Sequence, residues 1–483
     1  MHNFFYTIQE MLLDAAGPAL TVMAVGGVIL ALLYWIWYGK SVHLLPVGKG
    51  ATKGQIVATL LLLCYLGWLV AITLGLRHGN NFQMDIQTHP FLAFAEAWNT
   101  FTLQVWLNPL LNIAMFIPLG VLLPLAVRPF RRWYWMLAAG LGTSLLVETF
   151  QYILNRGQAD IDDLICNTLG TLLGYCLCMT VVHLAARTWK TAGAYAALPV
   201  LSAVALAGIF LAYQLKPYGN LADAPIFAAN TSGTSWVLDT ELSDQPGHIG
   251  LYWAKPFTKD SGDEFARAFA KRRGLDLGNG DFDIDYYDNS AYYSDHHTFM
   301  LWLDYNDCSY KYEDYRVDGR GEENWGTSTE TELRGYLDSL DITVPDAAEF
   351  LDKGNGKYAF HASCVVEDGF LTDGELSCMV AQDGQVYRVY NTLSVCAIHS
   401  EVSVISEREA YRRLCAGRFN QTEASAFDHT APHAEVHVIS CTLKYLTDSK
   451  GFRQPVYYFT LSDRQDMELR GGSDWRVFVP ALA

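Results

Sequence analysis

The sequence predicts an α-helical membrane bundle of six transmembrane helices, followed by a soluble α+β extracytoplasmic domain. Six apolar runs, each long enough to span a bilayer, lie within residues 1–216. After Lys216 and Pro217 the pattern changes to short alternating strands broken by Gly and Asp. The charge changes at the same point, from +3 in residues 1–216 to −20 in residues 217–483. We therefore expect two domains, 1–216 and 217–483, the second being one unit or two similar subdomains.

Each of the six apolar runs is expected to be one membrane helix, and the loop charges set their orientation. The runs lie near residues 17–38, 55–76, 107–127, 133–154, 163–186 and 193–215. The first run lacks the basic flank of a cleavable signal peptide, so we expect it to remain as a span. Basic residues concentrate in three alternate loops, and such loops face the cytoplasm. They are Lys40, Lys49 and Lys53, then Arg128, Arg131 and Arg132, then Arg187 and Lys190. The N-terminus and the C-terminal domain are therefore predicted to be outside the cell membrane.

A polar stripe runs along the helix expected at residues 133–154. Ser144, Glu148, Gln151 and Asn155 recur at helical spacing on an otherwise apolar segment. A charge near the bilayer centre costs roughly 2.5 to 3.5 kcal/mol on insertion scales. Glu148 should therefore face other helices, water or a partner such as Arg156.

The next helix presents a second polar face. It opens with Asp160, Asp162 and Asp163, and Asn167 follows Asp163 by one helical turn. Because the two helices are joined by a short hairpin, they must be antiparallel neighbours. We expect Glu148, Arg156, Asp160, Asp163 and Asn167 to cluster in one outward-facing pocket. Further along, Gly170 and Gly174 are spaced to let a neighbouring helix approach closely.

These residues, together with Asn112 and the segment Phe116-Ile-Pro-Leu-Gly120, resemble the VanZ-like family of membrane proteins over roughly residues 55–185. The resemblance implies a small helical bundle, linked in some members to low-level resistance to the glycopeptide teicoplanin. It also implies a candidate polar site, made of Asn112, Glu148, Gln151, Arg156, Asp160, Asp163 and Asn167.

Two interpretations of this polar site remain open from sequence. The carboxylates and one arginine could supply general acid/base groups, or hold a divalent cation against the phosphate of a lipid-linked envelope component. Alternatively, the hairpin is polar because it is exposed to solvent, and Glu148 and Asn167 join helices by hydrogen bonds. The chain has no cofactor motif and no metal-binding motif, so we expect neither group. Whether the protein is an enzyme is left open.

Residues 217–483 are expected to alternate helices with antiparallel strands. A capping box of Ser261 and Glu264 predicts a helix up to Gly274, and one of Ser406 and Glu409 predicts a helix up to Gly417. Hairpins are predicted at three turns, near residues 304–307, 383–384 and 448–451. A short helix is predicted at residues 345–351.

The unit formed by residues 405–419 and 438–461 is similar to the helix-plus-hairpin repeats of PepSY-like and YycI-like extracytoplasmic domains. That resemblance implies binding of a protein or peptide. It supports an alternative function, a membrane-anchored binding or signalling module whose ectodomain recognises an extracytoplasmic protein. A domain this acidic is a poor candidate for binding nucleic acid. The expected partners are the lipid bilayer and a lipid-linked component or an extracytoplasmic protein.

Three further patterns in residues 217–483 have ordinary explanations. The alternating carboxylates of residues 281–288 suggest calcium, but Tyr286 and Tyr292 stand where an EF-hand needs Gly and Glu, so a solvated strand face is favoured. His296 and His297 would point to opposite faces of a strand, which favours surface histidines over a metal site. Six cysteines in this half permit up to three disulfides, and we expect at most one or two.

Overall fold

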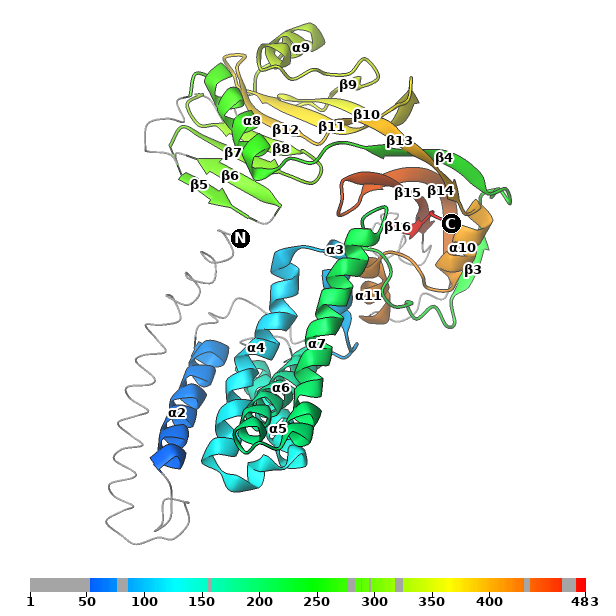
Figure 1. Cartoon of the computed structure of the whole chain (residues 1–483). Helices are drawn as coiled ribbons and strands as arrows, with labels where there is room; N and C mark the ends of the chain where they lie inside the picture. Colours follow the sequence, from blue (N-terminus) through cyan, green and yellow to red (C-terminus); the bar gives the residue numbers. More distant parts are fainter. Residues whose placement is uncertain are drawn as a thin grey trace. The chain divides into compact units, whose positions relative to one another are not determined.

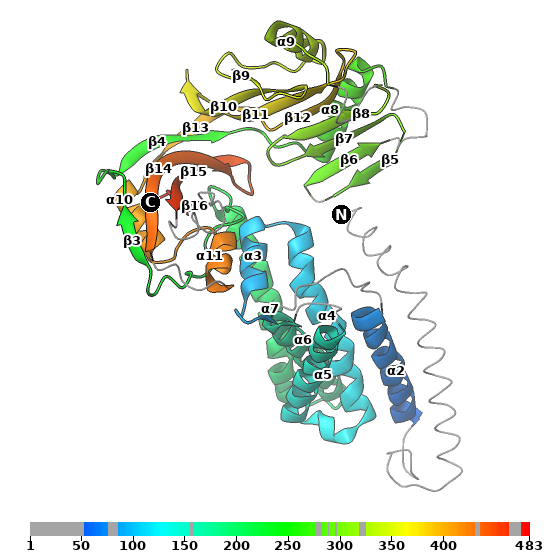
Figure 2. The same cartoon turned by 180° about the vertical axis from the view of Figure 1, so that it is seen from behind.

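The computed structural model describes residues 53–75, 86–154, 159–275, 283–287, 289–294, 297–317, 325–429, 435–462 and 475–483. The chain divides into two compact units. The first unit extends to Ala97 and continues over Leu103–Lys216. The second unit comprises Trp98–Thr102 and Pro217–Ala483. Figures 1 and 2 show the elements of both from opposite sides.

The described part of the first unit is helical. Its helices are α2 (Lys53–Val70), α3 (Leu92–Thr100), α4 (Leu103–Ala126), α5 (Trp133–Ile153), α6 (Ile161–Ala185) and α7 (Trp189–Leu215). A π-helical turn, η1 (Ala71–Gly75), continues α2, and a 3-10 turn, η2 (Arg128–Arg131), separates α4 from α5. Two short strands pair in parallel, β1 (Ile86–Gln87) and β2 (Ala159–Asp160). The first precedes α3 and the second directly precedes α6.

Four of these helical segments are long and apolar enough to cross a membrane. They are Gly54–Thr73, Leu103–Ala126, Ile161–Ala185 and Trp189–Leu215. Helix α5 has 21 residues, but its aromatic first turn and Glu148 lower its hydropathy. The predicted span at residues 17–38 lies outside the described residues. The membrane-spanning helical class is thus supported, whereas the predicted count of six helices is not confirmed.

The closest packing in the first unit is between α4 and α6. A Cβ added at Gly170 would lie 2.0 Å from the carbonyl oxygen of Ile113, and one at Gly174 would lie 2.0 Å from that of Ile117. In the reverse direction, a Cβ at Gly120 would lie 2.0 Å from the carbonyl oxygen of Thr171. The backbones of the two helices therefore touch, as the spacing of small residues predicted.

The second unit is built on one large, mostly antiparallel sheet. Its described strands follow the order β3-β14-β15-β4-β13-β11-β12-β8-β7-β6-β5, with β16 beside β15, β10 beside β11, and β9 beside β10. The strands are β3 (Ser235–Leu238), β4 (Gly247–Trp253), β5 (Asp283–Tyr286), β6 (Ser290–Ser294), β7 (Phe299–Asp304), β8 (Tyr310–Asp314), β9 (Glu349–Asp352), β10 (Lys357–Glu367), β11 (Phe370–Val380), β12 (Val386–Asn391), β13 (Ser394–Val404), β14 (Glu435–Thr447), β15 (Phe452–Ser462) and β16 (Trp475–Pro480).

Two hydrophobic cores divide this sheet into a first lobe and a second lobe. In the first lobe, formed by β5 to β12, helices α8 (Lys259–Arg272) and α9 (Glu330–Ser339) cover one face of the sheet (Figure 1). Their side chains Phe269 and Leu337 pack with Tyr312 and Phe360 of the strands. In the second lobe, α10 (Glu407–Cys415) and α11 (Gln421–His429) pack on β3 and β14 to β16 (Figure 2). That the two lobes are similar subdomains stays a prediction.

A buried ion cluster joins α8 to β8 in the first lobe. The Asp314 side chain is 1% exposed and accepts hydrogen bonds from Arg273, from Arg316 at 2.8 and 3.0 Å, and from the Tyr312 hydroxyl at 2.9 Å. Burial alone would raise the pKa of Asp314, but the hydrogen bonds from Arg316, Tyr312 and Arg273 outweigh it. They hold that pKa well below its ordinary value of 3.8.

Most local predictions for the second unit are confirmed. The three predicted hairpins are β7–β8, β11–β12 and β14–β15, each antiparallel. The Ser406 hydroxyl caps α10 by accepting the backbone N–H of Glu409, and Gly417 follows the helix at φ +73°. All ten cysteines are described, and each is a free thiol.

Two local predictions are wrong. The cap of α8 is Thr258, whose side chain exchanges hydrogen bonds with Ser261, so the helix begins earlier than the predicted box of Ser261 and Glu264. The helix predicted at residues 345–351 is instead a turn followed by β9, because pairing with β10 stacks Phe350 on Tyr358. Tertiary pairing overrides a weak local preference there.

Candidate functional site

The polar stripe of α5 is buried within the bundle. Ser144, Glu148 and Gln151 are all buried, whereas their helix neighbours Leu145, Leu146 and Thr149 are exposed. This agrees with the prediction that Glu148 turns away from lipid. The other members of the predicted stripe and site, Asn155 and Arg156, lie outside the described residues.

Glu148 meets the first turn of α6. Its Oε2 accepts the backbone N–H of Asp160 at 3.3 Å. Asp160 is itself the N-cap of α6, because its Oδ1 accepts the backbone N–H of Asp162 at 2.8 Å. Burial raises the pKa of Asp160 above its ordinary value, although the hydrogen bond from Asp162 opposes the change. Glu148 therefore lies at the positive end of the α6 dipole, which stabilises its charge.

Deeper in the bundle, two amides join α5 to its neighbours. The Nδ2 of Asn167 on α6 donates to the Ser144 hydroxyl at 3.0 Å. The Nε2 of Gln151 donates to the carbonyl oxygen of Thr73 at 3.1 Å, in the π-helical turn that follows α2. Both amides are buried, so these bonds fix the rotation of α5 against two other segments.

The third helix of the site is α4. Asn112 donates from Nδ2 to Oδ1 of Asp163 at 2.5 Å, which links α4 to the first turn of α6. Asn112, Asp160 and Asp163 are half-buried, unlike the deeper residues. The structure thus brings together the described candidates in adjacent pairs, from a half-buried end near the hairpin to a sealed end at Ser144. That they form one pocket open to the outer leaflet stays a prediction.

Two side-chain acceptors of the site lack a partner. Among the described residues, Oε1 of Gln151 and Oδ1 of Asn167 are buried without a hydrogen-bond partner. A buried acceptor left unsatisfied costs roughly 1 to 3 kcal/mol. Such atoms can be satisfied by an N–H or O–H donor that enters the bundle, so the arrangement suits a donor group.

Asp162 is a buried carboxylate that the sequence did not assign to the candidate site. Its carboxylate is buried, and its two oxygens accept the backbone N–H groups of Phe91 at 2.5 Å and Ala93 at 2.7 Å. These groups belong to the start of α3, which has no Ser, Thr, Asp or Asn of its own at the cap position. The missing cap was the available signal, because a helix start without a local acceptor needs a distant one.

No metal centre is formed by the residues that the structure describes. Within them, no group of three or more His, Cys, Asp or Glu side chains is placed to hold a metal ion. The carboxylates of the site instead accept hydrogen bonds from backbone and amide groups.

The comparison with known families agrees with this geometry. Residues 56–183, which contain α4, α5, all but the last two residues of α6 and every residue of the candidate site, match the VanZ/LLP1 family. This segment is VanZ-like. Of the four membrane-length helical segments among the described residues, the VanZ-like segment covers Leu103–Ala126 and most of Gly54–Thr73 and Ile161–Ala185, together with the glycines that bring α4 and α6 into contact, whereas Trp189–Leu215 lies beyond it.

Solved structures similar to the chain are remote. One is a crystal structure of an uncharacterized protein from Eubacterium rectale, with 11% identity and a TM-score of 0.22 over 48% of this chain and 82% of that one. Another is the Bacillus megaterium YpeB C-terminal domain, with 12% identity and a TM-score of 0.18 over 48% of this chain and 95% of that one. Neither TM-score reaches 0.5. No curated protein matches the chain.

Proposed function

We propose that this protein is a VanZ-like membrane protein of the bacterial cell envelope that contributes to resistance to teicoplanin-type glycopeptides. In this proposal, the polar site of α4, α5 and α6 binds the headgroup of a lipid-linked envelope component from the outer leaflet. The family match over residues 56–183 supports the membrane and envelope assignment.

The observation that carries the proposal is the buried group of acceptors around Glu148. Glu148 is an ionisable residue inside an apolar helix pair, and such residues are usually functional because they are costly to keep there. The unsatisfied oxygens of Gln151 and Asn167 lie on the same helix pair. An ammonium group of a headgroup has three hydrogens to donate, and an amide or hydroxyl group could satisfy one or two of these acceptors. The half-buried Asn112, Asp160 and Asp163 provide the entrance.

The orientation is part of the same proposal. The basic loops of η2 and of residues 186–190 connect α4 to α5 and α6 to α7, whereas the polar hairpin connects α5 to α6. In helices that alternate across a bilayer, these two kinds of connection lie on opposite sides. The basic loops are expected in the cytoplasm, which places the polar site, the N-terminus and residues 217–483 outside.

The test compares three variants in a strain that depends on this protein for glycopeptide resistance. Glu148→Gln keeps the shape and deletes the charge, and Thr149→Val is a matched control, because Thr149 is exposed on the adjacent position of α5. The third variant lacks residues 217–483. We expect Glu148→Gln to raise teicoplanin susceptibility at normal membrane abundance, and Thr149→Val to have no effect.

The contrary result would favour a second function. At the sealed end of the site, Nδ2 of Asn167 donates to the Ser144 hydroxyl, as expected of a hydrogen bond that only joins helices. If Glu148→Gln behaves as wild type and removal of residues 217–483 abolishes resistance, the membrane site is not the functional one. The protein would then act as a membrane-anchored module whose ectodomain recognises an extracytoplasmic protein or peptide.

A further inference from the structure

The first lobe has an open sheet face with a composition unlike the rest of its domain. Helices α8 and α9 cover one face of β5 to β12, and alternate side chains of these strands point to the other face. The strand register places Ser377 beside Tyr390, Tyr390 beside Lys311, and Lys311 beside Trp302. One row across four strands therefore combines a small residue, two aromatic rings and a cation.

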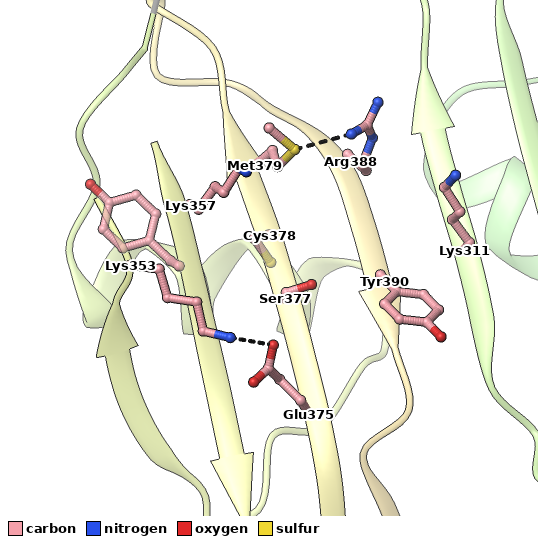
Figure 3. Close-up of a pocket in the computed structure, with 10 residues that line it drawn as sticks. Lys311, Lys353, Lys357, Glu375, Ser377, Cys378, Met379, Arg388 and Tyr390 are labelled. Atoms are coloured by element: carbon pink, nitrogen blue, oxygen red, sulfur yellow. Dashed lines mark hydrogen bonds and ion pairs between the residues drawn. The ribbon is translucent and has the colours of Figure 1, made fainter. Parts of the chain in front are cut away.

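A hollow of about 510 Å³ lies on this face. Four cationic side chains line it, namely Lys311, Lys353, Lys357 and Arg388, and Figure 3 shows them around the small residue Ser377. Glu375 is the one carboxylate among the lining residues. Residues 217–483 carry a net charge of −20, so a hollow with three more cations than anions is an exception within its own domain.

Two of these cations are available to a ligand. Lys353 forms an ion pair with Glu375 at 2.6 Å (Figure 3). Arg388 forms an ion pair with Glu313 at 2.7 Å. The ammonium groups of Lys311 and Lys357 have no hydrogen-bond or ion-pair partner within the part of the chain that the structure describes. Lys357 lies on β10, the strand next to that of Ser377, and Lys311 lies on β8, two strands from Ser377 on the other side. An anionic group in the hollow could therefore pair with either ammonium group without displacing an existing ion pair.

Exposed aromatic rings extend the hollow along the same face. Tyr390 is 48% exposed, and Trp302 is 38% exposed. The Trp302 ring stacks with that of Tyr287, with the ring centroids 5.3 Å apart and an interplanar angle of 29°. Tyr390 and Trp302 lie two strands apart, about 10 Å at the usual spacing of strands. Rings fixed on a flat sheet offer planar contact to the C–H faces of sugar rings, with the lysine between them.

The position of the hollow argues against a peptide ligand. An extended peptide binds a sheet by adding a strand to a free edge. The hollow lies on β10, β11, β12 and β8, each of which is paired on both sides. Backbone groups are thus not available there, and recognition must rely on the side chains of the face.

We propose that this open face of the first lobe binds an anionic saccharide, a sugar chain that carries phosphate or carboxylate groups. Acidic groups along the sugar chain pair with Lys311 and with Lys357, and the sugar rings stack on Tyr390 and Trp302. This binding site is separate from the polar site of the membrane helices and does not depend on the function proposed for it.

The test measures binding of defined oligosaccharides to the full-length protein in detergent at two salt concentrations. The probes are tetragalacturonate, a maltotetraose that carries a phosphate group, neutral maltotetraose and a hexaglutamate peptide. We expect at least one charged sugar to bind more tightly than the neutral sugar and the peptide, and less tightly at high salt. The first two probes distinguish a carboxylate ligand from a phosphate ligand.

Variants localise the site. Lys311→Met combined with Lys357→Met should weaken binding of the charged sugar roughly tenfold, the effect of losing one or two charge-assisted bonds. Trp302→Ala should weaken binding of charged and neutral sugars alike. Lys271→Met is the matched control, because Lys271 is an exposed lysine on α8, which covers the other face. Unchanged hydrogen exchange in β8 and β12 shows that the variants remain folded.

Three results would overturn the proposal. They are equal binding of charged and neutral sugars, binding of hexaglutamate as tight as that of the charged sugars, and an equal loss of binding in Lys271→Met and the double variant.

Discussion

Replacing Gly170 by alanine should force α4 and α6 apart. The new Cβ would lie 2.0 Å from the carbonyl oxygen of Ile113, against 3.4 Å for ordinary contact, so one backbone must move by about 1.4 Å. The obstacle is the backbone of a helix, which cannot rotate aside as a side chain can. Overpacking of this kind costs roughly 1 to 3 kcal/mol. Asn112, the residue before Ile113, would lose its hydrogen bond to Asp163 in the process.

The assay follows the thiol of Cys166, which is buried on α6 one turn before Gly170. The purified protein is labelled in micelles with rising amounts of a denaturing detergent, and mass spectrometry quantifies the peptide that carries Cys166. A cost of roughly 1 to 3 kcal/mol corresponds to labelling about 5 to 150 times faster. Gly142→Ala is the control, because a Cβ there meets nothing within 4 Å. Equal labelling in the two variants would refute the close approach of α4 and α6.

Two further predictions concern single carboxylates. Asp162→Asn should release the start of α3, because the Asp162 carboxylate accepts two backbone N–H groups there. Hydrogen exchange of the backbone amides in residues 91–97 should become faster. Unchanged exchange would contradict this role. Asp314→Asn should destabilise the first lobe by about 3 kcal/mol at pH 7, because it leaves Arg273 buried without its counter-charge. Since the pKa of Asp314 is depressed in the fold, its contribution is complete above its ordinary pKa of 3.8 and is lost as the pH falls further. Hydrogen exchange in β8 should therefore differ between wild type and variant at pH 7 and converge below pH 3.8; a constant difference would contradict the assignment.

Helical periodicity predicted the inner part of the candidate site well. The spacing of Ser144, Glu148 and Gln151 placed them on one face of the helix. Because a charged side chain is costly in lipid, that face was expected to turn toward the interior of the bundle. The antiparallel hairpin predicted that Asn167 would turn toward the polar stripe of α5, and its side chain donates a hydrogen bond to Ser144 of that stripe. Local chemistry likewise predicted the cap at Ser406, because its hydrogen bond to residue 409 is formed within one turn.

Contacts between distant segments could not be predicted in this way. Periodicity shows which residues share a face, but not that Asp162 accepts N–H groups from residues 91 and 93, about seventy positions earlier. The order of strands in the second unit is equally hard to predict, since β12 pairs with β8 although α9 and three strands, β9 to β11, lie between them in the chain. The open face of the first lobe therefore emerges only from the register, which brings Lys311 beside Tyr390.

The local sequence determined the conformation at some positions, and pairing with distant strands determined it at others. Gly417 and Gly384 end or turn the chain at positive φ, which few other residues adopt, so their signal was decisive. Residues 345–351 carry no such signal, and pairing of β9 with β10 determined their conformation. The four membrane-length helices were predicted from composition alone, because apolar length is itself the physical requirement for a span.

The central claim is that Glu148 and its neighbours bind a lipid-linked headgroup, and native mass spectrometry tests it most directly. The full-length protein is extracted gently from its own membranes, and the mass of any retained lipid is measured for wild type, Glu148→Gln and Thr149→Val. The account predicts that one lipid species of defined mass is retained by wild type and by Thr149→Val, and is lost from Glu148→Gln. Retention of the same species by all three proteins, or by none of them, would contradict it.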